Sequence, residues 1–198
     1  MRATKTQVRA TILAVRRSLT GQQHAAEAAA LAAHLVALAP AGSTMCAYVP
    51  VGTEPGSAQA LDTLCERGVT VLLPVARNDA DGTGLPLQWG RYRPDALVEA
   101  PFGLREPAPP WLPAEAVASA QTVFVPALAV DRRGTRLGRG AGFYDRTLRL
   151  ADPAARLVAV VRDDEVVDAL PVEDHDVPMT HALTPGRGLI ELRSDRPT

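Results

Sequence analysis

The segment from residue 123 to residue 150 combines an apolar run, a loop rich in glycine and arginine, and a helix. The apolar run, Val123–Val130, has the length of a buried strand and ends at Asp131. The loop DRRGTRLGRGAGFYD follows at once, and a helix is expected over Phe143–Leu150. A buried strand that leads through a loop into a helix is the repeating unit of α/β proteins. This segment therefore favours an α/β fold.

The rest of the chain also alternates between helices and strands. Val8, Ile12, Val15 and Leu19 recur at helical spacing, which predicts an amphipathic helix over residues 4–19. Further elements are expected as helices over residues 22–38 and 56–67, and as strands over residues 44–49, 69–73, 87–92, 157–162 and, at an edge, 189–193. The alternation predicts one α/β domain over residues 1–198 with a mostly parallel sheet.

Residues 99–113 carry five prolines and are expected to form a long ordered loop over the sheet rather than a regular element. Ligands of open parallel sheets bind where loops leave the carboxyl ends of the strands. The loops after Val49 and Val130 are therefore the places where a site is expected.

Composition limits the class of protein. The chain is 46% apolar with a net charge of −1, so it can bury a core, and it lacks the basic excess that extended nucleic-acid binding needs. Its apolar runs are shorter than the roughly 18 residues of a membrane span, and its charged first residues do not resemble a secretion signal. Two cysteines, Cys46 and Cys65, favour free thiols over a disulfide framework. A cytoplasmic protein that binds neither membrane nor nucleic acid is expected.

The loop 131–145 has the composition of a phosphate-binding site. Its glycines permit positive φ, so that successive backbone N–H groups can converge on one anion, and the helix behind it adds further N–H groups. Two arginines, Arg136 and Arg139, can hold phosphate oxygens. The loop lacks the Lys-Ser/Thr of a Walker A motif and the glycine spacing of a dinucleotide fingerprint. A plain glycine-rich turn with solvated arginines is the alternative.

Further charged residues are candidates for the same site. Lys5 is the single lysine among 21 basic residues, and it shares a helix face with Arg9, four positions on. Glu54 follows the strand that ends at Val49, and Asp145 lies in the first turn of a helix. The acidic run Glu173–Asp176 offers the oxygen ligands that Mg²⁺ prefers. Taken alone, none of these positions distinguishes a binding site from an ordinary solvated surface.

Together these residues resemble the 5-formyltetrahydrofolate cyclo-ligase family, also called methenyltetrahydrofolate synthetases. The resemblance extends in order over nearly the whole chain, and its most specific part is the motif RLGRGAGFYD. The matching positions are Lys5-x-x-x-Arg9, Glu54, Phe124–Pro126 with Asp131, Gly134 to Asp145, and Glu173-x-His175-Asp176-x-Pro178.

The resemblance implies a three-layer α/β/α fold similar to the sugar-phosphate isomerase and CoA-transferase type. It also implies closure of 5-formyltetrahydrofolate to 5,10-methenyltetrahydrofolate with ATP and Mg²⁺, giving ADP and phosphate. Residue by residue, it implies a catalytic role for Lys5 and Arg139; an ATP site of Lys5, Arg9, Gly134, Arg136, Leu137, Gly138, Arg139, Gly140, Ala141, Gly142, Phe143 and Tyr144; a folate site of Val49, Glu54, Phe143 and Tyr144; and a metal site of Asp145 and Asp176.

Two positions depart from the family pattern. Phe143 replaces the first of two tyrosines and so lacks its hydroxyl, and Thr180 stands where a further aspartate is usual. Two other functions stay open at this point: a sugar-phosphate isomerase that uses the loop without ATP, and an RNA-binding module. A monomer or weak dimer is expected.

Overall fold

A seven-stranded sheet forms the centre of the computed structural model, which describes residues 4–100, 104–173 and 176–192. Its strand order is β12-β11-β9-β6-β1-β2-β3. The five inner strands pair in parallel, and β3 and β12 add antiparallel edges. The strands are β1 (Thr44–Cys46), β2 (Thr70–Val75), β3 (Gln88–Arg91), β6 (Thr122–Pro126), β9 (Arg156–Val160), β11 (His181–Thr184) and β12 (Gly188–Glu191). The predicted α/β fold with a mostly parallel sheet is confirmed.

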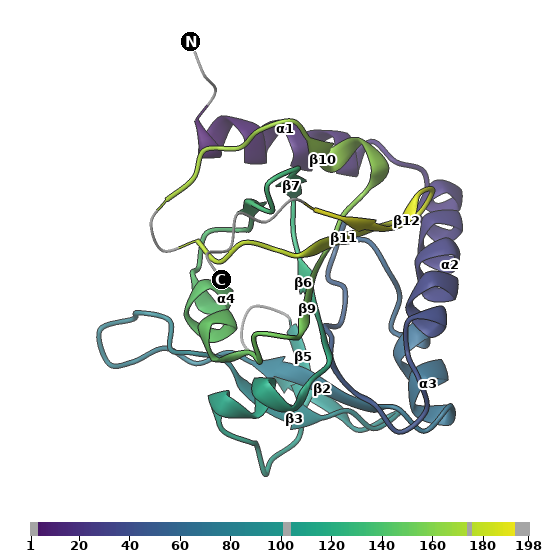
Figure 1. Ribbon diagram of the computed structural model, residues 1–198, viewed down its shortest axis with the longest axis vertical. Coiled ribbons are helices and arrows are strands. Elements are labelled where there is room, and N and C mark those ends of the chain that lie inside the picture. Colours follow the sequence, from purple (N-terminus) through teal and green to yellow (C-terminus); the bar gives the residue numbers. More distant parts are fainter. Residues whose placement is uncertain (1–3, 101–103, 174–175, 193–198) are drawn as a thin grey trace.

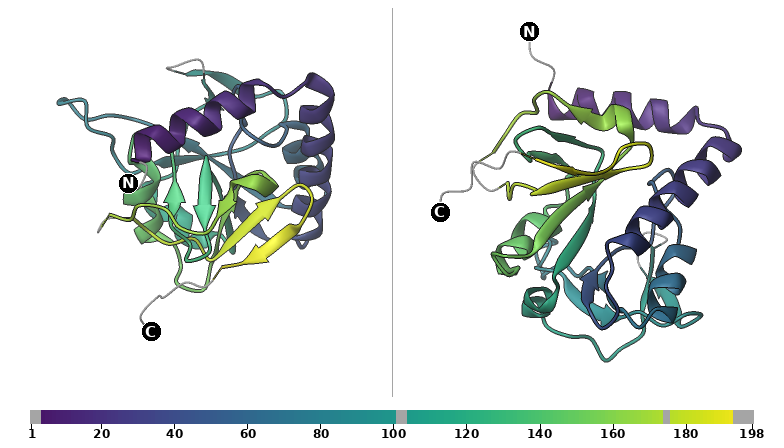
Figure 2. Two further views of the ribbon diagram at one scale, coloured as in Figure 1. Left: turned by 90° about the horizontal axis from the view of Figure 1, so that it is seen from above. Right: turned by 45° about the vertical axis from the view of Figure 1, so that its right-hand side comes forward.

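Helices cover both faces of this sheet, which gives three layers (Figure 2). On one face lie α2 (Gly21–Ala37) and α3 (Gln59–Glu66), whose leucines pack against Phe124 and Val158. The other face is covered by shorter pieces, namely η2 (Ala114–Ser119), α4 (Phe143–Thr147) and η3 (Leu148–Leu150). Within the described part of the chain, no helix is both long and apolar enough to cross a membrane.

A smaller sheet lies beside the large one and carries α1 (Lys5–Arg17) across it (Figure 1). Its strand order is β10-β7-β8, and η4 (Asp163–Glu165) precedes β10. The strands are β7 (Ala129–Asp131), β8 (Arg136–Leu137) and β10 (Val166–Val167). A capping box of Thr4 and Gln7 starts α1, because each side chain satisfies a backbone N–H of the other.

The face of α1 that meets the protein differs in part from the predicted stripe. Val8 and Ile12 pack with Leu13 against the small sheet as a helical pattern requires. Val15 is 43% exposed, whereas the neighbouring Arg16 is fully buried. The sequence pattern therefore identifies the helix correctly and places the end of its buried stripe one residue too early.

Three other sequence expectations need correction. The run Val123–Val130 is not one strand, since β6 ends at Pro126, which has no N–H to extend a ladder, and the chain then turns into β7. Residues 99–113 are not wholly irregular, because β4 (Leu97–Ala100) and β5 (Leu104–Pro107) pair as an antiparallel ladder. A two-stranded ladder tolerates Pro107 at its end.

The predicted edge strand 189–193 is found at residues 188–191 as β12. The last residue of the predicted range, 193, lies outside the described part of the chain.

Candidate active site

The loop of residues 138–142, here called the glycine loop, connects β8 to α4. Gly140 and Gly142 have φ of 103° and 72°, which side chains with a Cβ adopt only with strain. Gly142 is the N-cap of α4. Because α4 is five residues long, rather than the eight expected, its dipole adds less to anion binding than the sequence suggests. The backbone of the loop remains the main group of N–H donors.

The first turns of α1 lie against the glycine loop, although about 130 residues separate them in the chain. Arg9 donates from Nε to the carbonyl of Gly138 at 2.9 Å. A Cβ on Gly140 would lie 3.7 Å from the guanidinium carbon of Arg9. Lys5 Nζ lies 3.2 Å from Asp176 Oδ2 and 3.2 Å from Glu173 Oε1. The structure therefore brings Arg9 to the glycine loop and pairs Lys5, one helical turn earlier on the same face of α1, with Asp176.

Arg136 and Asp145 form an ion pair at the base of the glycine loop. Arg136 Nη2 donates to Asp145 Oδ1 at 2.7 Å, and its side chain is 7% exposed. The guanidinium carbon lies 5.6 Å from the ring centroid of Tyr144, within the range of a cation–π contact. Arg136 therefore supplies positive charge beneath the loop, and Asp145 is its counter-ion.

A second ion pair joins the glycine loop to the loop after β1. Arg139 Nε lies 3.0 Å from Glu54 Oε1, and the other carboxylate oxygen of Glu54 accepts from the N–H of Val51 at 3.0 Å. Arg139 is half exposed, whereas the Glu54 side chain is 11% exposed. Val49 lies within this loop, because β1 ends at Cys46 and not at Val49 as predicted, and it is partly buried against the core beside α2 and α3. The predicted ATP and folate segments are thus in direct contact.

Two tyrosines border this junction and stay protonated. Burial, followed by the charge of Glu54, raises the pKa of Tyr48 well above its ordinary value, and its hydroxyl donates to the carbonyl of Pro55 at 3.1 Å. Burial, followed by the same carboxylate, also raises the pKa of Tyr144, while Arg136 lowers it less. The buried Tyr144 hydroxyl has no hydrogen-bond partner among the described residues. It can therefore donate to a ligand.

Other predicted site residues have contacts within the protein. Gly134 lies in the turn between β7 and β8, where a Cβ would come 2.3 Å from the carbonyl oxygen of Met179. Leu137 is buried beneath α1. The ring of Phe143 lies against Gly84 in the 78–84 turn, and Ala141 is exposed on the glycine loop.

Two carboxylates, Asp145 and Asp176, are the predicted ligands of a metal ion. Within the described residues, no group of three or more His, Cys, Asp or Glu side chains is close enough to hold a metal. Mg²⁺ is commonly held by one or two carboxylates, with water and nucleotide phosphates as its other ligands, so two carboxylates are donors of the kind that this ion uses. Asp174 and His175, of the acidic run, lie outside the described residues.

Sequence reasoning did not single out the buried Arg16–Glu165 pair of α1 and η4. Its signal was available, because Arg16 follows Lys5 by eleven residues, close to three helical turns. The pair of Arg77 and Glu106 was also missed; Arg77 stacks on Trp111 with its guanidinium carbon 4.3 Å from the ring centroid. Both pairs join segments that are far apart in the chain.

Comparison with known proteins gives consistent matches. Residues 1–185 match the 5-formyltetrahydrofolate cyclo-ligase family. A 5-formyltetrahydrofolate cyclo-ligase from Mycolicibacterium smegmatis is 61% identical over 189 residues, covering 96% of this chain and 97% of that protein. Two solved structures share the fold. The 5,10-methenyltetrahydrofolate synthetase of Aquifex aeolicus has a TM-score of 0.71 at 23% identity, covering 98% of this chain and 95% of that one. The synthetase of Mycoplasma pneumoniae has a TM-score of 0.67 at 17% identity, covering 89% of this chain and 96% of that one.

Proposed function

Because this chain belongs to the 5-formyltetrahydrofolate cyclo-ligase family and is a ligase of folate one-carbon metabolism, we propose that it closes 5-formyltetrahydrofolate to 5,10-methenyltetrahydrofolate while ATP is converted to ADP and phosphate. One observation carries the ATP requirement. Four cations from two distant segments gather around a loop whose glycines let backbone N–H groups converge on an anion, and each of the four is paired with a carbonyl or carboxylate oxygen. A triphosphate offers the oxygens for which such a set is suited.

The nucleotide is proposed to lie on the glycine loop. Lys5 and Arg9 bind its phosphates from the side of α1, and Arg139 binds them from the loop itself. The backbone of residues 138–144 supplies N–H donors, and Arg136 neutralises charge from below. Lys5 and Arg139 are the proposed catalytic cations. A compact ammonium and a planar guanidinium can both stabilise the negative charge on the phosphoryl group while it is transferred.

Asp145 and Asp176 are the proposed ligands of Mg²⁺. Both carboxylates are paired with a cation, Asp145 with Arg136 and Asp176 with Lys5. When bound, the ion would neutralise phosphate charge and polarise the phosphoryl group. Lys5 is then free to turn from Asp176 toward the nucleotide.

The folate is proposed to lie beside Glu54, in contact with Val49, Phe143 and Tyr144. Glu54 is a buried acceptor for N–H groups of the pterin, and Tyr144 offers a hydroxyl donor that has no partner in the described part of the chain. Phe143 contributes an apolar ring only, so the hydrogen bond that a tyrosine would make there is absent. Arg139 bridges the two substrates, since it contacts Glu54 on the folate side.

The chemistry accounts for these groups. The formyl group on N5 is an amide, and its oxygen is a poor leaving group as hydroxide. The formyl oxygen attacks the γ-phosphorus, ADP departs, and the oxygen becomes a phosphate ester. N10 then attacks the formyl carbon, phosphate leaves with that oxygen, and N10 loses its proton to solvent. Both nucleophiles belong to substrates, so the protein supplies positioning and charge neutralisation.

Both cysteines are free thiols, which suits the reducing cytoplasm in which we propose that the enzyme acts. We further propose that residues 1–198 act as one domain and as a monomer or weak dimer.

The decisive experiment mixes the purified protein with 5-formyltetrahydrofolate, ATP and Mg²⁺ and follows the methenyl product by its absorbance. Product should form only with all three components, and ADP should appear in equal amount. Omitting ATP, replacing it by a non-hydrolysable analogue, or adding EDTA should each stop the reaction. Product formation without ATP, or none in the complete mixture, would reject the proposal.

A further inference from the structure

Arg16 is the one α1 residue that is buried, and it is bonded on three sides. Its Nε and Nη2 donate to the two carboxylate oxygens of Glu165 at 2.7 Å each. Nη2 also donates to the carbonyl of Ala127 at 2.7 Å. Glu165, itself 4% exposed, accepts in addition from the N–H of Arg162 at 2.8 Å. The planar fork of Arg16 is therefore held in one orientation.

Arg16 lies on the same stripe of the helix as the two cations that reach the glycine loop. An α-helix turns by about 100° per residue. Arg9, four residues after Lys5, therefore lies about 40° around the helix axis from it, and Arg16, eleven residues after Lys5, lies about 20° from it. Arg16 is about 16 Å from Lys5 along the axis. A rotation of α1 about its axis that displaced Arg16 would therefore turn Lys5 and Arg9 away from the loop by the same angle.

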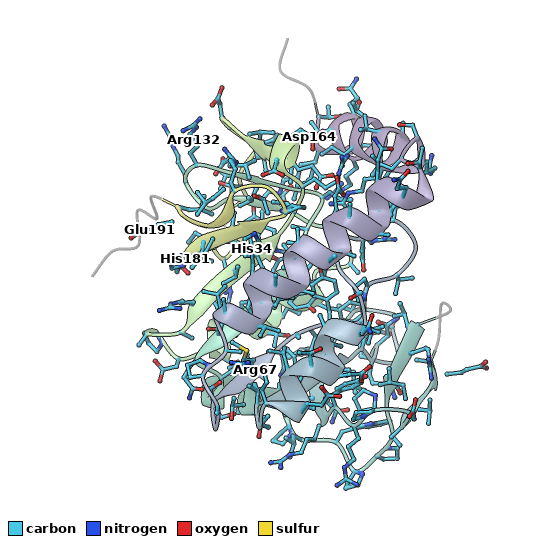
Figure 3. All side chains as sticks on the ribbon, turned by 90° about the vertical axis from the view of Figure 1, so that its right-hand side faces the viewer. His34, Arg67, Arg132, Asp164, His181 and Glu191 are labelled. Atoms are coloured by element: carbon cyan, nitrogen blue, oxygen red, sulfur yellow. The ribbon has the colours of Figure 1, made fainter. Side chains whose placement is uncertain are left out.

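The apolar contacts of α1 restrain its rotation only weakly. Val8, Ile12 and Leu13 pack against the small sheet, and apolar contact has no preferred direction. The carbonyl that Arg16 binds belongs to Ala127, and the preceding carbonyl, of Pro126, lies 3.5 Å from Arg136 Nη1. Arg16 and Arg136 therefore attach α1 and the base of the glycine loop to consecutive carbonyls at the end of β6. Figure 3 shows Asp164, the neighbour of Glu165, at the end of the molecule where α1 lies.

We propose that Arg16 and Glu165 are positioning residues for ATP: their buried pair fixes the rotation and axial position of α1 so that Lys5 and Arg9 face the glycine loop. This inference rests on the proposed function. Neither residue touches a substrate; both act through Lys5 and Arg9.

The energetics of buried ion pairs agree with a positioning role. A buried pair is often no more stabilising than apolar side chains of similar volume, because both charges lose their hydration. Arg16 Nη1 is buried without a partner among the described residues, so part of that loss stays uncompensated. Beyond packing, the pair fixes the orientation of α1, because a bidentate guanidinium–carboxylate contact is made in one geometry only.

The test compares three variants with wild type by steady-state kinetics. Arg16→Met leaves Glu165 buried and unpaired, so the double variant Arg16→Met/Glu165→Leu is added to keep the protein folded with an apolar contact in place of the pair. Glu27→Gln is the matched control, because Glu27 pairs with Arg162 at 2.8 Å but belongs to α2. Melting temperatures are measured for all three.

For the double variant we expect kcat/KM for ATP to fall about tenfold or more, while the KM for 5-formyltetrahydrofolate changes less than about twofold. ATP should also protect this variant against thermal unfolding less than it protects wild type. Glu27→Gln should lower the melting temperature without changing kcat/KM for ATP. Wild-type ATP kinetics in the double variant, or equal losses for both substrates, would overturn the positioning role. Failure of the proposed function is distinguishable, because the wild-type enzyme would then itself form no product with ATP.

Discussion

The ammonium group of Lys5 lies 3.2 Å from Asp176 Oδ2, although the two residues are 171 positions apart in the chain. The contact joins the start of α1 to the loop before β11. Asp176 is mostly buried at 11% exposure, and its Oδ2 also accepts from the N–H of Glu173 at 2.8 Å. In the proposed function, Lys5 exchanges this carboxylate for phosphate when ATP binds.

Replacing Lys5 by alanine should therefore weaken the use of ATP. A hydrogen bond between charged groups contributes about 1.5–3 kcal/mol, so kcat/KM for ATP should fall about 10- to 100-fold. The KM for folate should change little. Arg17→Ala is the control, because Arg17 is an exposed cation on the same helix. If both variants lose ATP efficiency equally, Lys5 has no specific role.

Replacing Arg139 by lysine should lower kcat/KM for ATP about tenfold or more, because an ammonium cannot reproduce a planar two-point contact. Stability should hardly change, since ion pairs with an exposed partner contribute at most about 1 kcal/mol. Arg132→Lys is the matched control, as Arg132 is 73% exposed and pairs with the exposed Asp168. Kinetics and melting curves of both variants provide the measurement, and full activity of Arg139→Lys would exclude a bidentate phosphate contact.

Features that depend on local spacing were predictable from the sequence. Lys5 and Arg9 are four residues apart in a helical pattern, and in the structure both lie on α1, where Arg9 contacts the glycine loop and Lys5 pairs with Asp176. The glycines at 140 and 142 have the positive φ that the loop composition suggests. Such features follow from helix geometry and from the conformational freedom of glycine, and neither requires knowledge of distant segments.

Features that join distant segments were not predictable in the same way. Helical spacing places Arg16 on the same face as Lys5, but only the position of the distant Glu165 shows that Arg16 is buried while Arg17 is exposed. β11 was not predicted, since its four residues show no alternation and are defined by pairing with β9 and β12. Burial between strands overrides intrinsic preference in such short segments.

Replacing Gly134 by alanine tests whether this residue is structural or binds ATP. The new Cβ would meet the carbonyl oxygen of Met179 at 2.3 Å with φ at +88°, so the variant should lose at least about 2 kcal/mol of stability. Gly42→Ala has a similar φ of +80° and open space around it, so it should lose only the conformational cost of about 1 kcal/mol. Denaturant unfolding measures both. Should Gly134→Ala keep its stability but lose ATP efficiency, the residue belongs to the nucleotide site.

Lowering the pH should destabilise the protein through His181. Burial lowers the pKa of His181 below its ordinary value, and the nearby charge of Arg156 lowers it further, while Glu191 opposes both. Because the folded state binds the proton less readily than the unfolded state, stability is greatest above the unfolded pKa and falls as the pH drops through it toward the folded pKa. Melting temperatures from pH 8 to pH 5 should therefore decline less steeply in His181→Gln than in wild type.

Glu191→Gln should have the opposite effect on this pH dependence. Glu191 lies directly across the β11–β12 ladder from His181, and Figure 3 shows both on the carboxyl-terminal hairpin. Removing its charge takes away the interaction that raises the pKa of His181, so the pKa in the folded state falls further. The difference between folded and unfolded states grows, and stability should then be lost more steeply on acidification than in wild type. A shallower decline in Glu191→Gln would show that another group, rather than His181, governs stability in this pH range.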